Sequence, residues 1–171
     1  MKVIIVTGLS GSGKSVALHT LEDVGFYCVD NLPGSMLPEL ISRLDQSVEM
    51  NHDSVAVGID ARSEPDSLGA LIKIIDDLDK LENLTVDILF LETNQEILLK
   101  RFSETRRKHP LSNQATPLLS AIKKEQNFLL TLKERADLVI DTSRLNLHQL
   151  REIIFKRMVG REKENLSLIH I

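Results

Sequence analysis

The chain has 171 residues and a formal net charge of −4, with 42% hydrophobic and 27% charged residues. This composition is typical of one globular domain with a sizeable core, and no apolar run approaches the ~18 residues of a membrane span. The acidic balance argues against a chain that binds nucleic acid non-specifically over its whole surface, although a local basic patch is compatible with it.

The first expected strand and the loop after it carry a strong phosphate-binding signature. Lys2–Thr7 is a nearly continuous run of β-branched residues, typical of a buried parallel strand. Residues 8–15 read Gly-Leu-Ser-Gly-Ser-Gly-Lys-Ser, the Gly-x-x-x-x-Gly-Lys-[Ser/Thr] phosphate-binding loop. A helix is expected over Ser15–Val24, so strand, loop and helix follow one another as the motif requires.

This loop predicts a site for a nucleoside triphosphate. Backbone N–H groups of such loops wrap the β-phosphate, and the helix dipole favours an anion. Lys14 is expected to bridge the β- and γ-phosphates as a catalytic cation, and the Ser15 hydroxyl is expected to bind Mg²⁺. The predicted phosphate-contacting residues are Gly8, Leu9, Ser10, Gly11, Ser12, Gly13, Lys14 and Ser15.

Strand and helix patterns alternate along the rest of the chain. Further strands are expected over Phe26–Asp30, Ser54–Asp60, Val86–Glu92 and Asp137–Asp141. Helices are expected over Leu37–Leu44, Asp66–Lys80, Gln95–Arg107, Leu118–Arg135 and Leu147–Gly160, the last opened by a capping pair of Asn146 and Gln149. The alternation predicts an α/β P-loop NTPase fold, with a kinase-like five-stranded parallel sheet flanked by helices. Ligands of such sheets bind beyond the carboxyl ends of the strands.

Two strand ends compete for the carboxylate that would help Ser15 hold the metal. The third strand is followed by Asp60-Ala61-Arg62-Ser63, so Asp60 is expected to bind Mg²⁺ and Arg62 to bind a phosphate. A strand-end Asp that caps the next helix is the plainer alternative. Glu92 ends a similar hydrophobic run and is the alternative metal ligand. We favour Asp60, because Arg62 follows it two residues later.

Two other strand ends are candidate ligand contacts. Asp30, followed by Asn31-Leu32-Pro33, is placed to touch a second small molecule or a metal-bound water, although these residue types also favour turns. Thr142, in Asp141-Thr142-Ser143, is placed to contact the base of a nucleotide, although it equally suits helix entry.

A basic cluster follows the fourth strand, in Lys100-Arg101 and Arg106-Arg107-Lys108-His109-Pro110. P-loop kinases place mobile arginines here that close on the transferring phosphates, which makes Arg106 and Arg107 catalytic candidates. An RNA-facing patch and a solvated helix face are the alternatives.

The remaining features concern boundaries and location. The single cysteine, Cys28, lies in an apolar run and is expected to be a buried free thiol in a reducing cytoplasm. The phosphate-binding domain is expected over residues 1–160, and residues 161–171 are expected to be a linker and the start of a further, missing domain. The alternating segment Leu166–Ile171 would then be a strand that could pair with another copy, giving a homo-oligomer.

Several segments together resemble the RapZ/YvcJ family of bacterial nucleotide-binding proteins. They are the phosphate loop, Leu-Glu-Asp-Val-Gly-Phe-Tyr-Cys-Val-Asp-Asn-Leu-Pro at 21–33, Thr-Arg-Arg-Lys-His-Pro-Leu at 105–111, and Ala-Asp-Leu-Val-Ile-Asp-Thr-Ser at 136–143. The resemblance implies a domain that binds and hydrolyses ATP and GTP, with ATP at Gly8–Ser15 and a guanine-nucleotide site at Asp60–Ser63. Family members often carry Asn where this chain has Ser63.

The resemblance also implies a C-terminal domain, absent here, that binds small regulatory RNAs and presents them to a ribonuclease. Contact with RNA is therefore expected only through that domain. Two other functions stay open: a small-molecule kinase whose second substrate lies near Asp30 and Arg62, and a non-catalytic module that senses a nucleotide.

Overall fold

The protein is built around one sheet of five parallel strands. The computed structural model describes residues 1–46, 52–59, 68–105, 108–112 and 117–159. The strands lie in the order β2-β3-β1-β4-β5. Their bounds are β1 Lys2–Gly8, β2 Tyr27–Leu32, β3 Ser54–Ile59, β4 Thr85–Glu92 and β5 Leu138–Asp141. The predicted α/β class, strand number and parallel pairing are confirmed.

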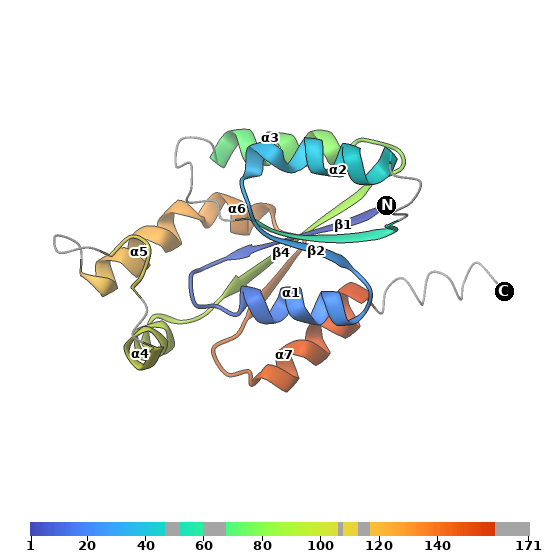
Figure 1. Ribbon diagram of the computed structural model, residues 1–171. Coiled ribbons are helices and arrows are strands. Elements are labelled where there is room, and N and C mark those ends of the chain that lie inside the picture. Colours follow the sequence, from blue (N-terminus) through green and yellow to red (C-terminus); the bar gives the residue numbers. More distant parts are fainter. Residues whose placement is uncertain (47–51, 60–67, 106–107, 113–116, 160–171) are drawn as a thin grey trace.

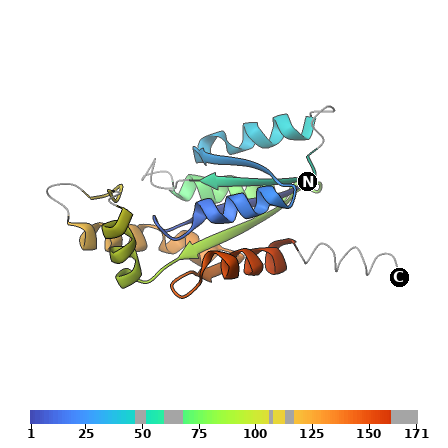
Figure 2. The same cartoon turned by 60° about the horizontal axis from the view of Figure 1, so that its bottom comes forward.

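Helices cover both faces of the sheet (Figure 1). Helices α2 and α3 lie on one face, and α1 and α7 lie on the other, while α4 and α5 lie at one end of the molecule in both views (Figures 1 and 2). The bounds are α1 Lys14–Asp23, η1 Gly34–Met36, α2 Leu37–Gln46, α3 Leu68–Asp79, α4 Gln95–Thr105, α5 Leu118–Phe128, α6 Leu130–Arg135, α7 Leu147–Ile154 and the π-helical turn η3 Phe155–Val159.

The central strand shows why the sheet needs helices on both sides. Val3 and Ile5 of β1 face the cluster that includes Leu37 of α2, whereas Ile4 faces the opposite cluster with Leu21 of α1. All five side chains are at most 1% exposed. Because each buried apolar side chain of this size stabilises the fold by roughly 1.5–3 kcal/mol, the two clusters fix the strand that carries the phosphate loop.

Three expectations about local structure need correction. The helix expected over Leu118–Arg135 is two helices, because Leu129 leaves helical geometry (ψ 0°) and packs into the core. The second strand, expected over Phe26–Asp30, runs from Tyr27 to Leu32 past an irregular register, so Asp30 is not its last residue. Cys28 is a free thiol, but its side chain is only half-buried. Burial, reinforced by the charge of Glu22, raises the pKa of the Cys28 thiol to about 11.

The start of α7 follows the sequence prediction. The Asn146 side chain accepts a hydrogen bond from the Gln149 backbone N–H at 2.8 Å, and the Gln149 side chain accepts one from the Asn146 N–H at 3.0 Å. Residues 161–171, with the expected linker and the segment Leu166–Ile171, lie outside the described residues. None of the described helices is long and apolar enough to cross a bilayer.

Candidate phosphate-binding site

The predicted phosphate loop lies at the carboxyl end of β1, the middle strand, and leads directly into α1. Gly8 begins the loop with a φ of +138°, and a Cβ there would lie 2.1 Å from the carbonyl oxygen of Leu91. The loop therefore approaches β4 more closely than any side chain would allow. The next residue, Leu9, donates its backbone N–H to the same Leu91 oxygen at 3.0 Å.

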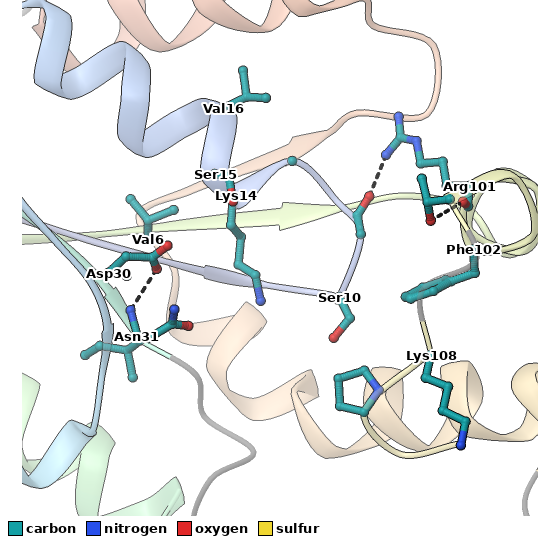
Figure 3. A pocket seen from close by; sticks show the side chains of 16 residues that line it. Val6, Ser10, Lys14, Ser15, Val16, Asp30, Asn31, Arg101, Phe102 and Lys108 are labelled. Atoms are coloured by element: carbon teal, nitrogen blue, oxygen red, sulfur yellow. Dashed lines mark hydrogen bonds between the residues drawn. The ribbon is translucent and has the colours of Figure 1, made fainter. Parts of the chain in front are cut away.

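The loop curls into a cradle whose open side faces a cavity of about 490 Å³. Ser12 closes the curl, because its N–H and its hydroxyl both donate to the Leu9 carbonyl, at 3.1 and 2.6 Å. Lys14 extends along the cavity, and its Nζ donates to the Gly8 carbonyl at 3.0 Å (Figure 3). Ser15 is exposed at the first turn of α1 and lines the same cavity. A helix N-terminus with a lysine beside it is a site for phosphate oxygens.

Arg101 of α4 holds the loop from the side opposite Lys14 (Figure 3). Its Nη1 donates to the Gly11 carbonyl at 2.8 Å and contacts the Thr93 hydroxyl at 3.3 Å, and its Nη2 donates to the Thr142 carbonyl at 3.4 Å. The guanidinium fork thus joins the phosphate loop to the ends of β4 and β5. Its side chain lines the cavity.

Thr142, the predicted base contact, is 2% exposed and is bonded to the loop. Its hydroxyl donates to the Ser12 carbonyl at 2.8 Å, so its 2.6 Å bond to Thr93 takes its proton from the Thr93 hydroxyl. Arg101, Thr93, Thr142 and Ser12 therefore form one directed chain of hydrogen bonds. The described contacts give Thr142 the role of supporting the loop, and contact with a nucleotide base stays a prediction.

The far wall of the cavity is formed by the ends of β2 and β3. Asp30 and Asn31 lie there, across the cavity from Lys14 (Figure 3). The Asp30 Oδ1 accepts the Asn31 N–H at 2.8 Å, and Asn31 adopts a φ of 54°. A Cβ on Gly58 would lie 2.5 Å from the Asp30 Oδ1, so glycine is what leaves room for the carboxylate. Left-handed backbone and close approach of this kind cluster at ligand sites.

The Ser15 hydroxyl and the Asp30 carboxylate line the described cavity, and both are oxygen ligands of the kind that suits a magnesium ion. No group of three or more His, Cys, Asp or Glu side chains that could hold a metal occurs among the described residues. Mg²⁺ usually keeps several waters and takes few protein ligands beside substrate phosphates, so a small donor set fits it.

Glu92, the sequence alternative to Asp60, points elsewhere. Its Oε2 lies 2.7 Å from the Nζ of Lys133 on α6, and it is not among the residues that line the cavity. Asp60 to Ser63, with Ala61 and Arg62, and the arginines Arg106 and Arg107 lie outside the described residues. Their roles at the metal, the phosphates and the guanine nucleotide stay predictions.

Sequence reasoning missed Glu125 as a residue that contacts the loop directly, and it named Arg101 only as part of the basic cluster. Glu125 of α5 is 1% exposed, and its two carboxylate oxygens accept the N–H and the hydroxyl of Ser10, each at 2.7 Å. The signal was present, because Glu125 shares one helix face with the buried Ile122 and Leu129. A carboxylate in an apolar stripe indicates a buried polar partner.

Comparisons with known proteins agree with this geometry. Residues 1–162 match the family described as RapZ-like N-terminal domain. A protein named nucleotide-binding protein from Stutzerimonas stutzeri is 45% identical over 169 residues, which are 99% of this chain and 59% of that protein. One of the same name from Pseudoalteromonas atlantica is 46% identical over 99% of this chain and 58% of its own length. The chain thus spans about three-fifths of these relatives.

Solved structures share the fold at low sequence identity. YorR from Bacillus subtilis, in complex with phosphorylated GDP, superposes with a TM-score of 0.63 at 14% identity, covering 95% of this chain and 98% of that one. Shikimate kinase from Acinetobacter baumannii, in complex with shikimate, gives 0.59 at 14% identity over 93% of both chains. A gluconokinase from Sinorhizobium meliloti gives 0.55 at 18% identity over 98% and 96%. The architecture is therefore that of P-loop kinases.

Proposed function

The chain belongs to the RapZ-like N-terminal domain family, and from its phosphate loop we propose that it binds ATP and GTP with Mg²⁺ and hydrolyses them slowly. In this proposal it is the regulatory nucleotide-binding domain of a longer RapZ-like protein. The observation that carries the proposal is the cradle between β1 and α1, with Lys14 and Ser15 lining a cavity large enough for a triphosphate. The names of its relatives support the same ligand class.

The described residues suit binding of the triphosphate. The backbone N–H groups of the loop and of the first turn of α1 would surround the β-phosphate, and Lys14 would exchange its bond to the Gly8 carbonyl for phosphate oxygens. Ser15 would hold Mg²⁺ together with the predicted Asp60. When bound, the ion offsets charge on the β- and γ-phosphates.

Hydrolysis needs cations at the γ-phosphate and a group that orients water. Lys14, with the predicted Arg62, Arg106 and Arg107, would offset the charge that spreads over the transferring phosphoryl group. Asp30, a carboxylate across the cavity from Lys14, would orient the attacking water.

A small-molecule kinase is the second candidate, because the cavity continues from Lys14 to Asp30 and Asn31. In that case a hydroxyl of a second ligand would replace the water beside Asp30 and accept the γ-phosphoryl group. The acceptor would be a small polar metabolite, since the far wall offers a carboxylate and an amide.

Transfer of label from γ-labelled ATP separates the two functions. The protein, Lys14→Ala and Asp30→Asn are incubated with labelled ATP and Mg²⁺, with and without a pool of small metabolites. Label that appears only in free phosphate, and that Lys14→Ala abolishes, supports hydrolysis. Label that appears in a metabolite, and that is lost in Asp30→Asn, would support the kinase in place of the hydrolase. If the wild-type protein released no more label from ATP than Lys14→Ala does, both functions would be contradicted.

A further inference from the structure

A buried carboxylate outside the phosphate loop holds the loop through its third residue. Glu125 of α5 accepts both the N–H and the hydroxyl of Ser10, each at 2.7 Å, although 115 positions separate the two residues. Side chains of this kind are rarely buried without partners, because an isolated buried carboxylate costs several kcal/mol. The conformation of Ser10 and the position of Glu125 therefore determine each other.

His109 lies on the other side of the same carboxylate. Its side chain is fully buried, and its Nε2 lies 3.4 Å from the Glu125 Oε1. The Leu111 N–H donates to the His109 Nδ1 at 3.1 Å, which places the proton of the neutral ring on Nε2, toward the carboxylate. The ring also packs on Phe102 of α4, with ring centroids 5.2 Å apart.

Ser10, Glu125 and His109 together connect two parts of the cavity wall, the phosphate loop and the segment 108–112. Lys108 and Pro110, the neighbours of His109, line the cavity, and Ser10 lies between Lys14 and Lys108 in the view of Figure 3. A carboxylate beside the loop would repel an anionic ligand. Glu125 does so less, because both of its oxygens accept hydrogen bonds from Ser10 and its Oε1 lies 3.4 Å from the His109 Nε2.

We propose that Glu125 is a positioning residue of the phosphate loop, and that His109 links Glu125 to the 108–112 segment. The position of the loop and the position of Lys108 at the cavity would then depend on each other. The inference rests on the proposed nucleotide binding. It adds a physical link between the cradle and residues 108–112. Glu125 itself does not line the cavity, so it acts through Ser10.

Glu125→Leu, Glu125→Gln and His109→Leu test the link, with Glu134→Leu on an exposed position of α6 as the control. Two quantities are measured for each variant: the Kd for Mg-ATP, and the amide exchange rates of Ser10 and Leu111 without nucleotide. Thermal melting of the free proteins reports folding. The Gln side chain removes the charge and keeps one oxygen that accepts from Ser10, while an NH2 group that donates replaces the second oxygen.

The inference predicts that Glu125→Leu weakens Mg-ATP binding about ten-fold or more, as loss of about 1.4 kcal/mol in loop positioning would. The melting temperature should fall by several degrees, because the buried N–H and hydroxyl of Ser10 lose their acceptor, and the melting curve shows whether the variant is still folded at the temperature of the titration. Glu125→Gln should stay within about three-fold of the wild type. His109→Leu should weaken binding in the same direction and add little in the Glu125→Leu background, since the two act through one contact.

Wild-type affinity in Glu125→Leu, or effects of the two substitutions that add fully, would overturn the inference. If the wild-type protein bound no nucleotide, the proposed function would fail, and the exchange rates would still decide the link. Faster exchange of the Ser10 amide in Glu125→Leu, and of both Ser10 and Leu111 in His109→Leu, supports it. Unchanged exchange in both variants contradicts it. Should Glu125→Leu fail to fold, His109→Leu carries the same two measurements.

Discussion

The guanidinium of Arg101 donates to the carbonyl of Gly11 at 2.8 Å, across 90 positions of the chain. The same fork reaches the Thr93 hydroxyl and the Thr142 carbonyl, so one side chain joins the phosphate loop to the ends of two strands. A loop that must present its N–H groups to a ligand gains from such support, because geometry set before binding need not be ordered during it.

Arg101→Ala is expected to weaken Mg-ATP binding by about ten-fold, because a charged donor to the loop carbonyl is worth roughly 1.5–3 kcal/mol and this side chain is partly exposed. Arg101→Lys should restore little, since an ammonium lacks the fork that reaches two elements. Calorimetric titration of each variant measures the effect. Lys100→Ala is the control, because Lys100 is exposed and its contact to Glu104 is 4.0 Å long. Equal affinities in Arg101→Ala and Lys100→Ala would contradict the role of Arg101.

Thr142→Val is expected to lower the free energy of unfolding by about 1–3 kcal/mol, because it leaves the buried Ser12 carbonyl and Thr93 hydroxyl without their partner. Urea unfolding of both proteins measures the difference. Thr85→Val, at the exposed start of β4, is the matched control and should stay within about 0.5 kcal/mol. A Thr142→Val protein as stable as the control would show that the hydrogen-bond chain contributes nothing.

A comparison of Gly8→Ala with Gly25→Ala separates two causes of destabilisation, a clash of the new Cβ with β4 and backbone strain at positive φ. Both glycines have positive φ, +138° and +102°, but a Cβ at Gly8 would lie 2.1 Å from the Leu91 oxygen, whereas nothing lies within 4 Å of one at Gly25. Gly25→Ala should cost about 1–3 kcal/mol from strain alone. Gly8→Ala should cost clearly more and should also abolish nucleotide binding. Denaturant unfolding and a binding titration test both, and equal destabilisation would argue against the close packing of β1 on β4.

The Asp141 carboxylate gives a prediction about pH. Hydrogen bonds from the Ser143 hydroxyl and backbone N–H lower the pKa of Asp141. A folded-state pKa below the unfolded value of about 3.9 means that this stabilisation is present above about pH 4 and is lost as the pH falls through the folded pKa. In Ser143→Ala, NMR titration should show the Asp141 pKa moving up toward its ordinary value. Ser103→Ala, on an exposed position of α4, should leave it unchanged. An Asp141 pKa equal in all three proteins would reject the contribution of the hydroxyl.

Most of the fold could be predicted because each strand and helix carries its own local pattern. Burial on both faces makes β1 a continuous apolar run, and the Asn146 and Gln149 pair marks the start of α7 within four residues of sequence. The break at Leu129 could not be predicted in the same way. Residues 118–135 contain neither Gly nor Pro that would mark a break, and the bend goes with the packing of Leu129 and Leu132 into a distant core.

The candidate site was predictable to the extent that its residues are neighbours in sequence. Lys14 and Ser15 come from one motif, and Asp30 was expected at the mouth of the site from its place near a strand end. The supports of the loop come from tertiary contacts. Glu125 lies 115 positions from Ser10, and Arg101 lies 90 positions from Gly11, so no spacing rule connects them.

Calorimetric titration of the wild-type protein and Lys14→Ala with Mg-ATP and Mg-GTP tests the central claim most directly. We predict that both nucleotides bind the wild type and that Lys14→Ala loses at least about ten-fold in affinity, because a cation on phosphate oxygens contributes roughly 1.5–3 kcal/mol. Lys80→Ala is the control, since Lys80 is exposed and directly follows α3. Binding that is undetectable in the wild type, or equal affinity in Lys14→Ala and Lys80→Ala, would contradict the account.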